Sequence, residues 1–172
     1  MKTNNVTISS YDKNWENEFK KIKFEIKKIL GNFALSIEHI GSTSVEGLSA
    51  KPIIDIDIVI KDNSVLNDVI EKLAINGYIF EGDLGIKDRF AFRYENKPQF
   101  MLHHLYVCPK NSAELKRHLK FRDYLRTHPN DMKNYEKVKL QGAKLYPNDI
   151  DKYIEYKSDF IESIYAKLDY QT

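Results

Sequence analysis

Two aspartates two positions apart, Asp55 and Asp57, carry the clearest chemical signal in the sequence. They lie in the run Ile53–Ile60, where isoleucines alternate with the acids. Successive side chains of a β-strand point to opposite faces, so both carboxylates share one face, about 7 Å apart. Neither is expected to be buried without a partner. Oxygen ligands at this spacing suit Mg²⁺ (or Mn²⁺) that also carries a substrate's phosphates. The alternative is a solvated strand face whose aspartates pair with lysines.

A glycine–serine turn precedes the aspartates by about a dozen residues. Gly41 and Ser42 follow a strand candidate, and Thr43 begins a short segment that leads through Lys51 to the aspartate strand. Glycine lets a ligand approach the backbone closely, and the serine hydroxyl and exposed amides can bind a phosphate. Such a turn followed by paired aspartates is the pattern of the nucleotidyltransferase superfamily, in which the turn binds the triphosphate and the aspartates bind metal.

The whole segment IEHIGSTSVEGLSAKPIIDID, which ends at Asp57, resembles the signature of the GrpB family. GrpB proteins are small, have the nucleotidyltransferase fold and also occur fused behind dephospho-CoA kinase. The resemblance implies one domain over residues 1–172, with an α/β (α+β) fold: a nucleotidyltransferase-like mixed β-sheet flanked by helices, with a helical C-terminal third. Further segments that carry it are YDKNW from Tyr11, HLYV from His104 and FRDYLRTHP from Phe121, with Tyr153 and Lys157 beyond.

Two positions depart from the family pattern. Glu46 stands where the family usually has the proline of Val-Pro-Gly-Leu, and Tyr106 stands where it usually has the second histidine of His-Leu-His. A function of that second imidazole is therefore not carried over to this chain.

Polymerase-like members of the superfamily add a third carboxylate from a later strand, but the matching segment here, Phe100–Val107, contains no acid. His104 is the candidate replacement, as a general base near neutral pH or as a metal ligand. The alternative is a structural histidine inside the sheet. An acid could also come from elsewhere, and the candidates are Glu38, Glu81, Asp83 and Glu95. His39 is expected to fix the geometry of the turn, and no geometric argument gives His118 or His128 a role.

Cationic side chains lie on apolar faces of the expected C-terminal helices. On a helical wheel, Arg122 and Arg126 fall within the leucine stripe of helix 112–127. Lys139 falls on the apolar face of helix 131–144, and Lys157 falls on the apolar face of helix 149–168. Inward charges are costly unless they are paired.

Two interpretations of these cations remain open. In one, acidic residues neutralise them in a structural network. In the other, the helical third closes over the aspartate strand, and Arg122, Arg126 and Lys157 share one cavity with Gly41 and Asp57, where they bind a phosphorylated ligand. Arg89 and Arg93, which share a strand face, could join that lining.

Other elements are predicted from hydrophobic period and turn residues. An amphipathic helix is expected at 15–30, and a second helix is expected to begin near Asn63 or Ser64 and to end before Gly77. Strands are expected at 34–40, 53–60, 78–81, 89–95 and 99–107.

Composition narrows the class of protein without naming a partner. The 172 residues are 30% charged and 42% hydrophobic, with a net charge of +2, which gives no strong signal for nucleic acid or a membrane surface. One cysteine, Cys108, excludes an intrachain disulfide and is expected to be a small buried residue. No long apolar run or signal sequence is seen, so we expect a cytoplasmic protein. The oligomeric state is not indicated.

These features predict metal-dependent binding of a nucleotide or related phosphorylated small molecule, with nucleotidyl transfer to an unknown acceptor as the implied reaction. Asp55, Asp57 and His104 are the expected catalytic residues, and the two aspartates are the expected metal ligands. The alternative is a non-catalytic binding module that lost the third carboxylate. The residues expected to bind phosphate are Gly41, Ser42, Thr43, Lys51, Arg93, Arg122, Arg126 and Lys157.

Overall fold

The computed structural model describes residues 5–169, which form one five-stranded mixed sheet with helices on both sides. The strands lie in the order β1-β2-β5-β4-β3. Strand β2 pairs antiparallel with β1 and parallel with β5, and β4 is antiparallel to β5 and β3. The strands are β1 (Ser36–Ile40), β2 (Ile54–Ile60), β3 (Tyr78–Gly82), β4 (Phe90–Tyr94) and β5 (His103–Pro109).

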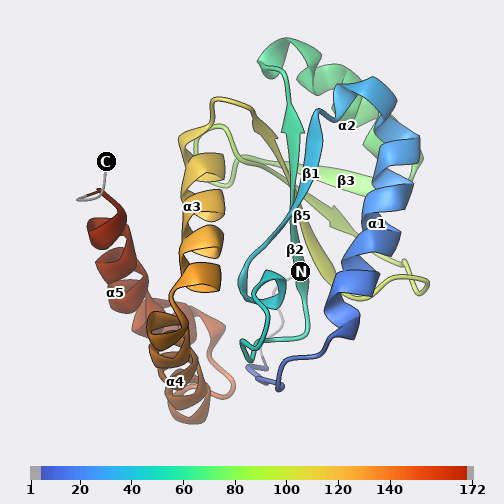
Figure 1. Cartoon of the computed structure of the whole chain (residues 1–172). Helices are drawn as coiled ribbons and strands as arrows, with labels where there is room; N and C mark the ends of the chain where they lie inside the picture. The colour runs from blue at the N-terminus through green and yellow to red at the C-terminus, as the bar shows by residue number, and fades with distance from the viewer. Residues whose placement is uncertain (1–4, 170–172) are drawn as a thin grey trace.

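Within residues 5–169 the chain has five α-helices. Figure 1 shows helices on both sides of the sheet. Helices α1 (Asn14–Leu30) and α2 (Leu66–Ile75) cover one face, where they bury the isoleucines of β2. The helical C-terminal third lies on the other side and consists of α3 (Ala113–Thr127), α4 (Pro129–Leu145) and α5 (Ile150–Asp169). The predicted α+β architecture is therefore confirmed.

Most element boundaries agree with the sequence prediction to within about two residues, the usual uncertainty of element ends. Two of the remaining shifts have a physical reason. Pro129, expected only to stop α3, is also the first residue of α4, because a proline at the first helical position loses no intrahelical hydrogen bond. Strand β5 begins at His103 rather than at residue 99 and runs on to Pro109, because its pairing with β2 sets its limits.

The two faces of β2 differ as the alternation predicted. Ile54, Ile56 and Ile58 are fully buried in the core that α1 and α2 cover. Asp55 and Asp57 point to the opposite face, where the register places them beside His104 and Tyr106 of β5. The second face therefore carries a polar row that runs across adjacent strands beneath the C-terminal helices.

Candidate functional site

The glycine–serine turn packs directly against Asp55. Gly41 has a φ of 70° and a ψ of −175°, a conformation that only glycine adopts readily. A Cβ atom at Gly41 would lie 2.2 Å from Oδ2 of Asp55, so no other residue fits without moving the carboxylate. The turn continues as a short 3₁₀ helix, Ser42–Ser44. Glycine thus lets the backbone approach the Asp55 carboxylate, and the close approach of a ligand to this turn stays a prediction.

His39 holds the glycine–serine turn in place through a contact with Thr43. Its Nε2 atom lies 3.0 Å from Oγ1 of Thr43, which donates to the carbonyl of Ile53 at 3.3 Å. The imidazole stacks on Phe19, and burial lowers its pKa to about 4, so it is neutral at physiological pH. This contact agrees with the expected role of His39 in local geometry.

Asp55 forms a partly exposed pair with His104. The Nδ1 atom of His104 lies 2.7 Å from Oδ1 of Asp55, and the two side chains are 35% and 29% exposed. A carboxylate only accepts, so Nδ1 must donate and Nε2 is left as the acceptor in the neutral ring. The pair has the geometry of a general base oriented by a carboxylate.

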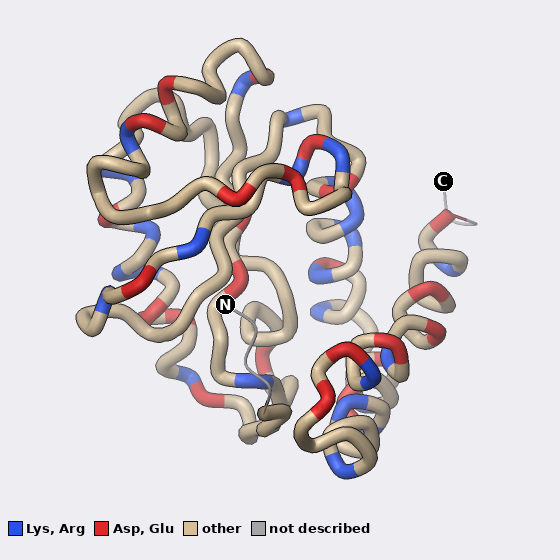
Figure 2. The backbone as a smooth tube through the Cα atoms, turned by 180° about the vertical axis from the view of Figure 1, so that it is seen from behind, with Lys and Arg blue, Asp and Glu red and all other residues tan. Residues whose placement is uncertain are grey.

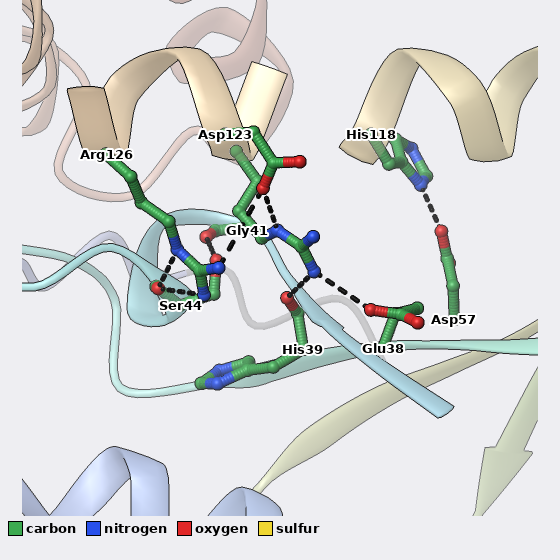
Figure 3. A network of polar contacts seen from close by, with 9 residues as sticks. Glu38, His39, Gly41, Ser44, Asp57, His118, Asp123 and Arg126 are labelled. Atoms are coloured by element: carbon green, nitrogen blue, oxygen red, sulfur yellow. Dashed lines mark hydrogen bonds and ion pairs between the residues drawn. The ribbon is translucent and has the colours of Figure 1, made fainter. Parts of the chain in front are cut away.

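Asp57 is held differently, by a histidine that the sequence did not single out. Its side chain has no exposed surface, and Oδ2 accepts from Nδ1 of His118 at 2.7 Å (Figure 3). The Nε2 atom of His118 lies 3.2 Å from a carboxylate oxygen of Glu114. Burial alone would lower the pKa of His118, but its hydrogen bonds to Asp57 and Glu114 raise it to about 9. An imidazolium therefore lies between two carboxylates.

A cavity of about 460 Å³ opens over the Asp55 end of this face. Its floor includes Asp55, His104 and Arg93, and part of its wall is Ser42 and Thr43 of the turn. Asp57 does not line it. Further side chains on its walls are Lys51, Glu81, Leu84, Arg89, Tyr106, Lys139, Ile150, Tyr153, Ile154 and Lys157.

Three lysines from three parts of the chain meet at this cavity. Burial lowers the pKa of Lys157 to about 8 against the opposing effect of Asp55, and the charge of Lys51 adds to the decrease. Burial and the charge of Lys157 lower the pKa of Lys139 to about 7. Burial also lowers the pKa of Lys51. Residues of both charge signs are interspersed along the described backbone (Figure 2).

The expected convergence is wrong for two arginines. Arg122 donates to Glu38 at 3.1 Å, to the His39 carbonyl at 3.2 Å and to Asp123 at 2.8 Å (Figure 3). Arg126 donates twice to the Ser44 carbonyl, at 3.1 and 2.8 Å, and lines a different cavity. Arg122 packs inward as the wheel predicted, whereas Arg126 is 43% exposed, and the two contact β1 and the turn instead of the site.

The two aspartates suit a divalent cation in their donor chemistry. Oδ1 of Asp57 is buried and has no hydrogen-bond partner among the described residues, and Oδ2 of Asp55 lies over Gly41. Within residues 5–169 no three His, Cys, Asp or Glu side chains gather as a metal cluster. Mg²⁺ commonly takes one or two carboxylates and completes its shell with phosphate oxygens and water. In donor chemistry the two carboxylates fit a magnesium ion that arrives with a phosphorylated ligand, with Asp55 at the cavity and Asp57 buried beside it.

A family model described as GrpB protein matches residues 5–167. The chain belongs to the GrpB family. Its relatives include UPF0157 protein YqkA of Bacillus subtilis, 35% identical over 92% of this chain and 46% of that protein. The glutamate-rich protein GrpB of Alkalihalophilus pseudofirmus is 33% identical over 92% of this chain and 93% of that protein. This GrpB chain thus spans less than half of the Bacillus relative.

Two solved structures place the fold. The crystal structure of GrpB from Enterococcus faecalis has a TM-score of 0.80 and 32% identity, and the match covers 94% of this chain and 99% of that one. Cid1 poly(U) polymerase with bound MgGTP has a TM-score of 0.56 at 13% identity, covering 80% of this chain and 44% of that one. The second likeness shows the nucleotidyltransferase-like fold alone.

A dephospho-CoA kinase of Mycolicibacterium paratuberculosis is 24% identical over 91% of this GrpB chain and 44% of its own length.

In the described part of this GrpB chain, every helix is too short or too polar to cross a bilayer. The cytoplasmic location stays a prediction.

Proposed function

We propose that the 460 Å³ cavity binds a nucleotide or a related phosphorylated small molecule together with Mg²⁺ or Mn²⁺, and that it supports nucleotidyl transfer to an acceptor hydroxyl. The observation that carries this proposal is the meeting of Lys51, Lys139 and Lys157 beside Asp55. Ammonium groups that repel one another in a partly dry site are stabilised when an anion binds between them.

The turn and the cations have different roles in binding. Ser42 and Thr43 meet the phosphates where Gly41 lets the backbone come close. Lys51 and Lys157 neutralise phosphate charge from the side, and Arg93 lies on the strand next to His104. Asp55 and Asp57 would hold the metal, which supplies charge stabilisation at the phosphates when bound.

His104 is the general base of the proposed reaction. In the proposed reaction the acceptor oxygen bonds to the α-phosphorus, the bond to the β-phosphate oxygen breaks and pyrophosphate leaves. The proton of the acceptor hydroxyl goes to Nε2 of His104, because the hydrogen on Nδ1 is donated to Asp55. Asp55 then stabilises the imidazolium that forms.

Calorimetry with ATP and with pyrophosphate, in Mg²⁺ and in EDTA, tests the binding step. We expect Lys157→Met to weaken binding about tenfold or more, which corresponds to the loss of one charge-assisted hydrogen bond. Lys152→Met is the matched control, because Lys152 is exposed on the same helix and pairs with Asp149. Equal affinity in wild type and Lys157→Met would contradict the proposed phosphate site.

The metal is tested on the same samples. We expect Mg²⁺ to strengthen ATP binding, and the double variant Asp55→Asn/Asp57→Asn to lose that gain. If the double variant responds to Mg²⁺ as wild type does, the aspartates are not metal ligands.

A second candidate function is a binding module without catalysis, favoured by the hydrogen bond of Asp57 to His118 and by the lack of a carboxylate on β5. Release of pyrophosphate from ATP in the presence of acceptors distinguishes the two. An enzyme releases pyrophosphate and slows in His104→Ala without losing ATP affinity, whereas a module binds ATP and releases none.

A further inference from the structure

A second cavity, of about 640 Å³, lies on the other side of the glycine–serine turn. Side chains from α1, the turn, the end of α3 and the start of α4 line it, and Thr43 lines both cavities. Its volume is within the range of small-molecule sites, about 300–1,000 Å³. The nucleotide proposal makes no use of it.

This second cavity carries charges of both signs. Glu16 and Lys20 of α1 neutralise one another at 2.7 Å. Arg126 and Glu46 are the remaining charges on its wall. Among the described residues Glu46 forms no ion pair, and it is exposed.

Arg126 differs from Arg122, one helical turn before it. Arg122 is 13% exposed and meets two carboxylates at hydrogen-bond distance. Arg126 is 43% exposed, bonds a neutral backbone carbonyl and comes no closer than 3.8 Å to the carboxylate of Asp123. A guanidinium has five N–H donors, and the Ser44 carbonyl takes bonds from only two of the nitrogens of Arg126, so Arg126 keeps N–H groups that can donate to an anion in the cavity.

Tyr11 lines this second cavity together with Glu46 and Glu16. Burial raises the pKa of the Tyr11 hydroxyl, and the charges of Glu46 and Glu16 raise it further. Phe19, Leu125 and Met132 supply apolar wall to the same cavity. The cavity thus combines a cation, a carboxylate and apolar surface.

We propose that this second cavity binds a small zwitterion, whose acidic group pairs with Arg126, whose amino group pairs with Glu46, and whose apolar part packs on Phe19, Leu125 and Met132. The balanced charge of the walls distinguishes it from the cation-rich first cavity, which suits a polyanion. Opposite charges on one ligand are matched only if both ends bind at once.

Titration of ¹⁵N-labelled protein with 6-aminohexanoate, followed by amide NMR shifts, tests the proposal. The matched probes are hexanoate, which lacks the amine, and hexylamine, which lacks the acid. We expect 6-aminohexanoate to shift amides near Thr43 and Met132 and to bind at least about tenfold more tightly than either probe, the effect of one further charge-assisted bond.

Variants locate the two ends. We expect Arg126→Met and Glu46→Gln each to weaken binding of 6-aminohexanoate about tenfold, to the level of the single-charge probes. Arg117→Met is the control, since Arg117 lies on the same helix and pairs with Glu162 outside the cavity. If Arg126→Met fails to fold, Glu46→Gln decides alone, because Glu46 is exposed.

Three results would overturn the proposal. Hexanoate that binds as tightly as 6-aminohexanoate means a simple anion site, and hexylamine that does so means a simple cation site. No shift near Thr43 and Met132 with any probe means that the cavity takes no ligand of this class.

Discussion

Nδ1 of His118 lies 2.7 Å from Oδ2 of Asp57, a carboxylate with no exposed surface. The neighbouring pair, His104 and Asp55, has the same 2.7 Å separation but is about one-third exposed on both sides. One hydrogen-bond length therefore occurs in two solvent environments. The free energy lost when the histidine is removed depends on whether water can reach the carboxylate that is left without its partner.

The first prediction follows from this contrast. His118→Ala leaves a buried carboxylate without its partner, and we expect a loss of about 3–5 kcal/mol in the free energy of unfolding. His104→Ala exposes Asp55 to water, and we expect a loss below about 1 kcal/mol. Urea unfolding at pH 7 measures both. Similar losses in the two variants would mean that burial does not separate the pairs.

The second prediction concerns Gly41. We expect Gly41→Ala to cost about 1–3 kcal/mol in backbone strain and to displace the Asp55 carboxylate, which lowers ligand affinity as well. Gly31→Ala is the control, because Gly31 also has a positive φ, of 55°, but a Cβ there meets no atom within 4 Å. Calorimetric Tm values and ATP titrations separate strain from the contact. If Gly41→Ala and Gly31→Ala changed ATP affinity equally, the close approach of Gly41 to Asp55 would have no role in ligand binding.

The third prediction is a loss of stability in mild acid. Burial lowers the pKa of both His39 and His103 to about 4, against about 6.5 when unfolded. The unfolded chain therefore binds more protons between pH 6.5 and 4, and stability falls as the pH falls through that range. Each histidine contributes a slope of up to about 1.4 kcal/mol per pH unit.

Variants isolate this effect from that of the carboxylates. We expect His39→Gln and His103→Gln each to flatten the pH dependence of the unfolding free energy between pH 6.5 and 4, compared with wild type. An unchanged slope in both variants would show that the two imidazoles become protonated in the folded protein.

The fourth prediction separates the two inward arginines. Arg122→Met removes the partner of Glu38, which is 28% exposed, and we expect a loss of about 1.5–3 kcal/mol in stability. Arg126→Met removes bonds to a backbone carbonyl at a half-exposed site, and we expect a loss of about 1 kcal/mol. Thermal unfolding of both variants measures the order, and a larger loss in Arg126→Met would reverse the assignment of Arg122 as the structural residue.

The Asp55 part of the site was predictable because it depends on local rules. Alternation along β2 fixes the face of Asp55, and a glycine before a serine marks the turn. The placement of His104 beside Asp55 needed only the assumption that β5 adds to β2 in register, which the family resemblance supplied.

The role of His118 was not predictable from the strand pattern, because it depends on how α3 packs against the sheet. A usable signal existed: Glu114 and His118 are four residues apart on one helix face, and on the wheel that face adjoins Arg122. Packing between helices also determines that Arg122 contacts β1 whereas Lys157 lines the first cavity. A wheel gives the direction of a side chain relative to its own helix axis only.

The parallel pairing of β2 with β5 joins Asp55 to His104 across 49 positions of the chain, and α2, β3 and β4 lie between them. Contacts of such long sequence separation form slowly, because the loop entropy is lost before the pairing is gained. No partly folded chain in which β2 and β5 are apart contains the cavity floor. A bound ligand should therefore slow hydrogen exchange at the amides of β2 and β5 together, as one cooperative unit.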